Sequence, residues 1–160
     1  GQEKGIVLKQ AEQAGVLGTN LFIEDSLPKK QMPALLSAAD MASSLFIDLP
    51  EMQPNSANKF FDSLASSTPI MLNYGGWMHE LVEGKKCGLA MWRKPVSEVA
   101  RIVSSRITDR QWLETAGAAA RSLAESEFDR DRLAVQFAEV ITKSAIGQGQ
   151  SAEHIAPGRY

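Results

Sequence analysis

The sequence predicts an α/β fold in which a parallel sheet is flanked by helices and the last third of the chain is helical. Before residue 96, short apolar runs alternate with amphipathic helical patterns. This alternation is typical of βαβ units, whose parallel strands are joined by right-handed crossovers. From residue 96 onward, apolar residues recur at helical spacing in three successive segments, which indicates helices without further strands.

The elements expected before residue 96 follow from this alternation. Each predicted strand is a short apolar run, and each predicted helix has apolar residues three and four positions apart. In chain order they are helix 4–14, strand 20–23, helix 28–39, strand 41–47, helix 57–66, strand 69–72, helix 77–83 and strand 88–91. Pro28 and Pro33 fall in the first two turns of their helix, where proline is tolerated. Residues 49–55 form a loop with two prolines.

Three amphipathic helices are expected in the last third. Apolar stripes run along residues 96–107 and 112–123, and Asp129 is a good N-cap for the third helix. The apolar face of that helix carries Leu133, Phe137, Val140 and Ile141. Residues 146–160 hold three glycines, a proline and little apolar periodicity, which predicts a flexible tail. We therefore predict one domain over residues 1–145 and a tail over 146–160.

Composition narrows the class of protein. The chain has 160 residues, enough for one domain with a hydrophobic core. Its formal net charge of -2 provides no basic surface, so no nucleic-acid partner is predicted. Cys87 is the single cysteine, which excludes an internal disulfide and fits a reducing compartment. No apolar run approaches the roughly 18 residues of a membrane span.

The most informative segment is the predicted helix 57–66 with the strand and turn that follow it. Apolar residues, Phe61 among them, form one stripe of this helix, so we expect the Phe61 ring to be buried beneath any site. Asn58 and Asp62, four positions apart, share the other face. Gly75 and Gly76 follow the next strand and open another helix. Helix starts present unpaired N–H groups, and glycines permit close approach, so this arrangement suits a polar ligand that carries phosphate.

In order and spacing, these residues resemble the donor half of a GT-B glycosyltransferase. The resemblance is closest to the family 4 retaining enzymes that build bacterial surface polysaccharides. The matching runs are Asn58-Lys59-Phe60-Phe61-Asp62-Ser63-Leu64-Ala65, Pro69, Gly75-Gly76 and Glu80-Leu81-Val82. Residues 32–40 resemble the helix-to-strand passage of that family, and residues 112–137 resemble its closing helices. The resemblance covers roughly residues 2–145.

The resemblance implies a Rossmann-like domain that binds a nucleoside-diphosphate sugar at the carboxyl ends of the strands. The sugar would be transferred to a lipid-linked or glycan hydroxyl. In the family position of Asp62 a carboxylate binds the ribose hydroxyls; the alternative is a solvated carboxylate on the helix face. Lys59 reaches a phosphate or only extends into solvent, and Asn58 contacts ligand or satisfies the backbone at the helix start. The predicted nucleotide-sugar site comprises Ser56, Asn58, Lys59, Asp62, Gly75 and Gly76.

One residue departs from the family pattern. Family 4 enzymes usually carry a glutamate eight positions before the ribose-binding acid, near the transferred sugar. That position is Pro54 here, and a proline side chain cannot act as an acid. Glu51, Asn55 and Ser56 are the candidates to replace it, so the catalytic residue is left open.

The start of the sequence carries a further expectation. Residues 1–4 resemble the end of the glycine loop that follows the second strand of the family's donor domain. We therefore expect an N-terminally truncated fragment, lacking two strands, a helix and the acceptor domain, that transfers no sugar alone. Family members work in the cytoplasm, often at the inner membrane face, without an obligatory metal or cofactor. The alternative function is a non-catalytic doubly wound domain that regulates or interacts by binding a nucleotide or a protein.

Other chemistry-bearing residues are interpreted as structural. His79 and His154 lack metal-ligand spacing, so no metal site is predicted. The sequence contains no Gly-x-Ser-x-Gly elbow, no Gly-x-Gly-x-x-Gly fingerprint and no P-loop. Trp77 and Trp92 are interpreted as packing residues rather than platforms for a sugar ring.

Overall fold

The computed structural model of this chain describes residues 3–152, and the side chains of residues 3–144. The chain divides into two compact units, Gly1–Met32 and Pro33–Tyr160. Each unit is described by itself.

The first unit contains α1 (Lys4–Gln13), where a helix was predicted. The strand predicted over 20–23 is not formed. Instead, the backbone N–H groups of residues 19, 20 and 21 all donate to the carbonyl oxygen of Val16. A tight turn therefore consumes the donors that a strand would offer to a ladder, and only an isolated bridge between Leu17 and Leu21 remains.

The second unit is an α/β fold with a small parallel sheet. The strands β1 (Ala42–Ser44), β2 (Ile70–Leu72) and β3 (Gly88–Ala90) pair in that order, with their first residues side by side in register. This confirms the predicted parallel arrangement, although each strand is shorter than the run that predicted it.

Helices provide most of the regular structure of residues 3–152. Besides α1 they are the 3₁₀ turns η1 (Lys29–Gln31) and η2 (Pro50–Met52), and the helices α2 (Met32–Ser37), α3 (Asn58–Ala65), α4 (Trp77–Lys85), α5 (Val96–Ile107), α6 (Arg110–Glu127) and α7 (Arg130–Ala152). The single helix predicted over 28–39 is divided into η1 and α2. Pro33 lies at the second position of α2, where its missing N–H removes no helical hydrogen bond.

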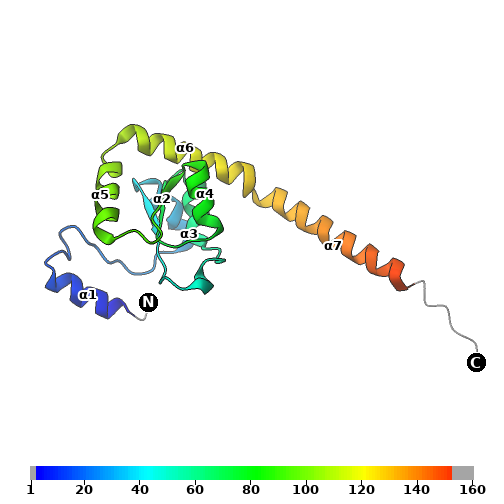
Figure 1. Cartoon of the computed structure of the whole chain (residues 1–160), viewed down its shortest axis with the longest axis horizontal. Helices are drawn as coiled ribbons and strands as arrows, with labels where there is room; N and C mark the ends of the chain where they lie inside the picture. The colour runs from blue at the N-terminus through cyan, green and yellow to red at the C-terminus, as the bar shows by residue number, and fades with distance from the viewer. Residues whose placement is uncertain (1–2, 153–160) are drawn as a thin grey trace, which may run out of the picture. The chain divides into compact units, whose positions relative to one another are not determined.

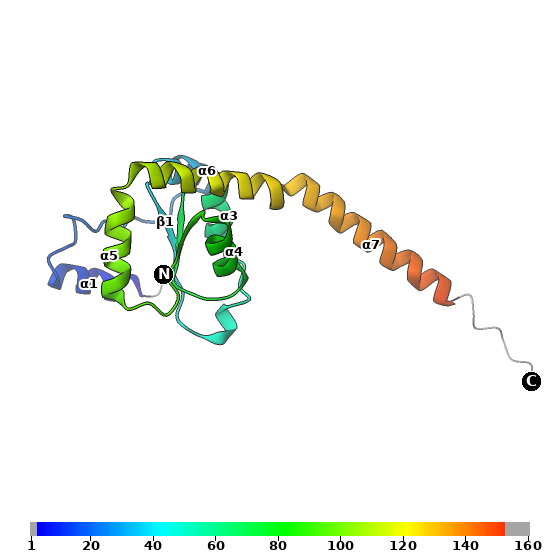
Figure 2. The same ribbon diagram turned by 45° about the horizontal axis from the view of Figure 1, so that its top comes forward.

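Helices lie on both faces of the sheet. Ile70 and Leu72 join the main hydrophobic core with residues of α3, α4 and α6. Met71 has the opposite orientation in the same strand and lies beside Val103 and Ile107 of α5. Figures 1 and 2 show α5 on the other side of the sheet from α3 and α4. The alternation of side chains along β2 therefore determines which helices cover which face.

Phe60 lies at the centre of the main core. It is fully buried, and its ring makes edge contacts with Phe61, Trp77 and Phe128. The core residues with no exposed surface are Phe60, Leu64, Ile70, Leu72, Met78, Val82, Cys87 and Ala120. Phe61, which we expected to be buried, is only half-buried. The buried centre of α3 is formed by Phe60, Ser63 and Leu64, and Phe61 lies at the margin of that stripe.

The helical last third is confirmed. Asp109 and Asp129 accept hydrogen bonds from the backbone N–H of Trp112 (3.0 Å) and Arg132 (2.8 Å), and so cap α6 and α7. The apolar face of α7 predicted from the sequence is exposed at Leu133, Phe137, Val140 and Ile141.

Helix α7 continues to Ala152 and so covers the beginning of the segment 146–160 predicted as a flexible tail. A started helix gains one backbone hydrogen bond with each added residue. Residues 153–160 lie outside the described part of the chain. Within residues 3–152, no helix combines the length and apolar character needed to cross a bilayer.

Because Phe60 is fully buried, Phe60→Ala should lower the free energy of unfolding by about 3–5 kcal/mol, through lost burial and a residual cavity. Phe61→Ala should cost less, since part of its ring already contacts solvent. Lys59→Ala changes an exposed neighbour and should stay within about 0.5 kcal/mol of the parent. Urea denaturation of the three variants measures this order, and an equal loss for Lys59→Ala and Phe60→Ala would contradict the assignment of the α3 faces.

Cys87 should make the folded state sensitive to alkali. Burial raises the pKa of its thiol from 9.0 to about 11, so the folded state favours the neutral thiol. This contribution to stability is complete below about pH 9 and is lost as the pH rises toward about 11. Unfolding free energies measured from pH 8 to 11 should fall, and Cys87→Ala should remove this component of the loss. Since the chain has one cysteine, rapid iodoacetamide labelling of the folded protein at pH 8 would contradict the buried position.

Candidate functional site at the carboxyl edge of the sheet

The carboxyl ends of the three strands lie at one edge of the sheet. There the loop between β1 and α3 contacts the segments that follow β2 and β3. The first attachment of this loop is a pair of hydrogen bonds between the Asn73 side chain and the backbone of Phe46. Asn73 Oδ1 accepts from the Phe46 N–H, and Asn73 Nδ2 donates to the Phe46 oxygen, both at 2.9 Å. The side-chain amide of Asn73 therefore replaces a strand ladder, which explains why β1 ends before residue 47.

The same loop is held against the start of α4. Trp77 Nε1 donates to the carbonyl oxygen of Asn55 at 3.1 Å. Gly76, the N-cap residue of α4, has φ +98°, and a Cβ atom built there would lie 2.0 Å from the Gln53 oxygen. Only glycine fits this backbone conformation and this close approach. The two helix starts of the site, those of α3 and α4, are thereby linked.

A third contact joins the loop to the end of β3. Trp92 Nε1 donates to Asp48 Oδ1 at 3.2 Å. The Trp92 ring also packs on Gly75, where an added Cβ would meet three ring carbons at 2.8–2.9 Å. The Arg93 guanidinium lies 4.4 Å from the Trp92 ring centroid, and His79 makes an edge contact with that ring at 6.0 Å. Trp77 and Trp92 therefore both make packing and hydrogen-bonding contacts within the protein.

The predicted site residues of α3 lie on its outer face. Asn58 and Lys59 are exposed, and Asp62 is half-buried, on the side opposite the buried Phe60 and Leu64. The N-cap of α3 is Ala57, without a side-chain cap. Asn58 is the first residue of the helix and does not provide the N-cap, which was one of the two alternatives for it.

The remaining predicted residues lie near the start of each helix. Ser56 is exposed just before α3, while Gly75 is buried and Gly76 half-buried before α4. Gln53 and Asn55, which precede α3, contact the start of α4, so the residues before α3 and the residues before α4 lie at the same edge of the sheet.

Asp62 also lines a hollow of about 450 Å³ between α3, the end of α6 and the start of α7. Its other walls include Phe61, Phe128, Arg130 and Leu133. Gly75 and Gly76 are not among its lining residues. The Asp62 carboxylate is therefore accessible from a space with aromatic walls and one guanidinium, apart from the glycine turn.

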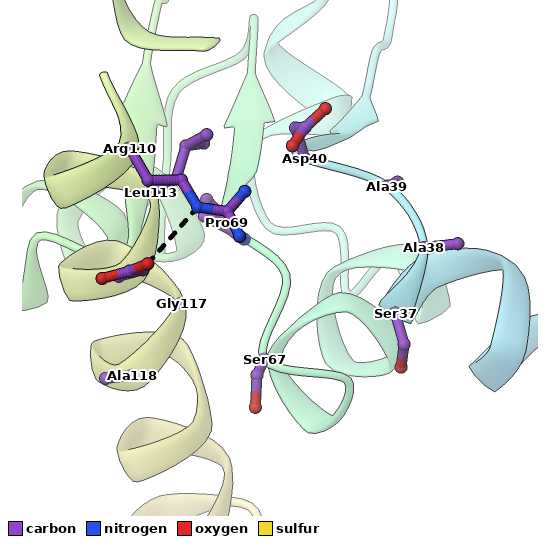
Figure 3. Close-up of a pocket in the computed structure, with 11 residues that line it drawn as sticks. Ser37, Ala38, Ala39, Asp40, Ser67, Pro69, Arg110, Leu113, Gly117 and Ala118 are labelled. Carbon is purple, nitrogen blue, oxygen red and sulfur yellow. Dashed lines mark ion pairs between the residues drawn. The ribbon is translucent and has the colours of Figure 1, made fainter. Parts of the chain in front are cut away.

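A second hollow lies at the opposite, amino edge of the sheet. It has a volume of about 620 Å³ and is lined by residues before β1, residues before β2 and the first turns of α6. Figure 3 shows its charged groups, where Arg110 pairs with Glu114 at 3.3 Å and Asp40 comes from the chain before β1. None of the predicted site residues lines it.

Metal coordination is not apparent at either edge. Among the described residues, no group of three or more His, Cys, Asp or Glu side chains could hold a metal ion. His79 lies 4.0 Å from Glu83, and His154 lies outside the described residues. Of the candidates to replace the missing glutamate, Glu51 and Ser56 are exposed and the Asn55 carbonyl oxygen accepts from Trp77.

Sequence reasoning missed three residues at this edge, Asp48, Asn73 and Arg93. Each acts through a partner far away in sequence or through its backbone conformation, since Arg93 has φ +58°. Local periodicity contains no signal for either property. The distance from Asn73 to Phe46 along the chain is 27 residues.

Comparison with known proteins adds no relative. The sequence matches no family model, and it matches neither a curated protein nor a solved structure.

The close contact at Gly76 can be tested by substitution. Gly76→Ala should destabilise the protein by at least about 2 kcal/mol, because alanine is strained at this φ and its Cβ meets the Gln53 backbone. Gly84→Ala is the matched control in the same helix, since no atom lies within 4 Å of its added Cβ. It should stabilise the protein by up to about 1 kcal/mol. Calorimetric melting of both variants checks the contrast, and equal melting temperatures would refute the close approach.

Proposed function

We propose that this chain is a Rossmann-like donor domain of a GT-B, family 4-like glycosyltransferase, which binds a nucleoside-diphosphate sugar. One observation carries the proposal. The start of α3, whose outer face carries Asn58, Lys59 and Asp62, is linked through Asn55 to the start of α4 at the carboxyl edge of a parallel sheet. In open α/β sheets, ligands bind at this edge.

The chemistry of these groups suits a nucleotide. The α4 helix begins at Trp77 without a side-chain cap, so its first N–H groups can donate to the oxygens of a diphosphate. The exposed ammonium of Lys59 adds a positive charge one helix away. The Asp62 carboxylate can accept hydrogen bonds from two adjacent ribose hydroxyls. Charge on the leaving diphosphate would be stabilised by these groups without an obligatory metal.

In the proposed reaction the sugar passes to a lipid-linked or glycan hydroxyl, with retention at the anomeric carbon. The whole enzyme would act in the cytoplasm, where enzymes of this family often work at the inner face of the membrane. The proposal assigns no general acid or nucleophile to this chain.

A non-catalytic interaction domain is the second candidate, and two observations favour it. The glycine turn is covered by the protein's own Gln53 and Trp92, so its glycines already have a structural reason. Three apolar side chains of the β1–α3 loop, Leu45, Ile47 and Leu49, are more than 40% exposed. Such residues at one edge suit a protein partner.

Asp62→Asn distinguishes these functions. If the carboxylate binds ribose, the variant should bind uridine or guanosine diphosphate about 1–3 kcal/mol more weakly, as expected for a lost charge-assisted hydrogen bond. Asp40→Asn at the amino edge is the matched control and should leave the affinity unchanged. Isothermal titration calorimetry gives both values. Equal affinities of Asp62→Asn and the parent would place the ribose elsewhere, and no heat from any nucleotide would favour the interaction domain.

A further inference from the structure

The Asp48–Trp92 hydrogen bond passes over the carboxyl end of the central strand. Asp48 follows β1 and Trp92 follows β3, while β2 lies between them in the sheet. A bond between the two outer loops must therefore span the end of β2, beside Gly75. The two side chains meet at 3.2 Å, so this crossing is a direct contact.

The position of the Trp92 ring is determined by its packing. Its ring carbons pack against the Cα of Gly75, and the edge contact with His79 holds it from the α4 side. With the ring in this position, the indole N–H donates to Asp48. Trp92 therefore orients the Asp48 carboxylate and is a positioning residue.

Trp92 holds two charged groups of opposite sign, Asp48 at its indole N–H and Arg93 over its ring. A carboxylate has about four acceptor positions, and the indole N–H occupies one position on Asp48 Oδ1. The Arg93 guanidinium lies over the Trp92 ring at 4.4 Å, on a backbone with φ +58°. Neither Asp48 nor Arg93 belongs to the ion pairs found among the described residues. Both are exposed and retain capacity for a ligand.

We propose that Asp48 and Arg93, oriented by Trp92, bind hydroxyl groups of the sugar that the nucleotide carries. This inference rests on the proposed function and adds the residues that recognise the sugar. A carboxylate and a guanidinium held by the same indole disfavour a ligand with a single charge of either sign. A sugar hydroxyl donates to the carboxylate and accepts from the guanidinium, so neighbouring hydroxyls can satisfy both groups. The location, next to the glycine turn at the start of α4, places the sugar beside the proposed diphosphate.

The experiment compares nucleoside diphosphates with the corresponding nucleoside-diphosphate hexoses by calorimetry. The probes are UDP with UDP-glucose and UDP-galactose, and GDP with GDP-mannose. The variants are Asp48→Asn, Trp92→Phe and Arg93→Gly. Glycine at position 93 accepts a positive φ, so this variant removes the guanidinium without adding backbone strain. Arg110→Ala, at the amino edge, is the control for a change of charge.

The expected result is a selective loss. Each site variant should bind the preferred nucleotide sugar about tenfold more weakly, the scale of one lost charge-assisted hydrogen bond. Binding of the matching diphosphate should stay within about twofold of the parent, and Arg110→Ala should change neither.

Two results would overturn the inference. If the diphosphate binds but the site variants weaken it and the nucleotide sugar equally, or leave both unchanged, the sugar lies elsewhere while the proposed function stands. If the parent binds neither diphosphates nor nucleotide sugars, the proposed function fails and this inference fails with it. Melting temperatures of Arg93→Gly and the parent, measured alongside, identify any loss that comes from unfolding.

Discussion

The close packing of the β1–α3 loop on the Gly75–Gly76 turn is the constraint on which the rest of this sheet edge depends. A backbone oxygen of Gln53 lies where a side chain at position 76 would have to lie. Because glycine permits this approach, the loop can also exchange hydrogen bonds with Asn73, Trp77 and Trp92. These contacts fix where α3 and α4 begin, and helix starts are the groups that an α/β protein offers to an anionic ligand.

The parts of the fold that depend on local periodicity were predictable from the sequence. The apolar stripe of α3, the parallel strands around it and the Asp129 cap of α7 all follow from neighbours within a few positions. The failures have long-range or geometric causes. Strand β1 ends early because the side-chain amide of Asn73, 27 residues away, hydrogen-bonds to the backbone of Phe46 in place of a neighbouring strand. The strand expected over 20–23 is lost to a turn around one oxygen of Val16, and apolar composition does not reveal that geometry.

The candidate site was predictable to a smaller extent. The sequence identifies the polar face of α3 correctly, since Asn58, Lys59 and Asp62 all lie away from the core. Sequence reasoning attributes the two glycines to the binding of a phosphate. In the structure, Gln53 and Trp92 occupy the space that side chains at these positions would need. The two explanations concern different atoms. The missing Cβ of Gly76 makes room for Gln53, while the N–H groups at the α4 start point along the helix axis and are not used by that contact.

The two faces of α3 separate stability from binding, and the loop before α3 connects them. Phe60 and Leu64 fix the helix to the sheet through burial, so substitutions there act on folding. Asn58 and Lys59 are exposed and have little buried surface to lose, so substitutions there act on what the edge can bind. Residues of the loop do both, because Asp48 belongs to the same loop whose Gln53 packs on Gly76. A variant of this loop that weakens ligand binding is therefore informative only when its melting temperature is known. Variants of Asn58 and Lys59 need no such correction, since exposed side chains contribute little to the folded state.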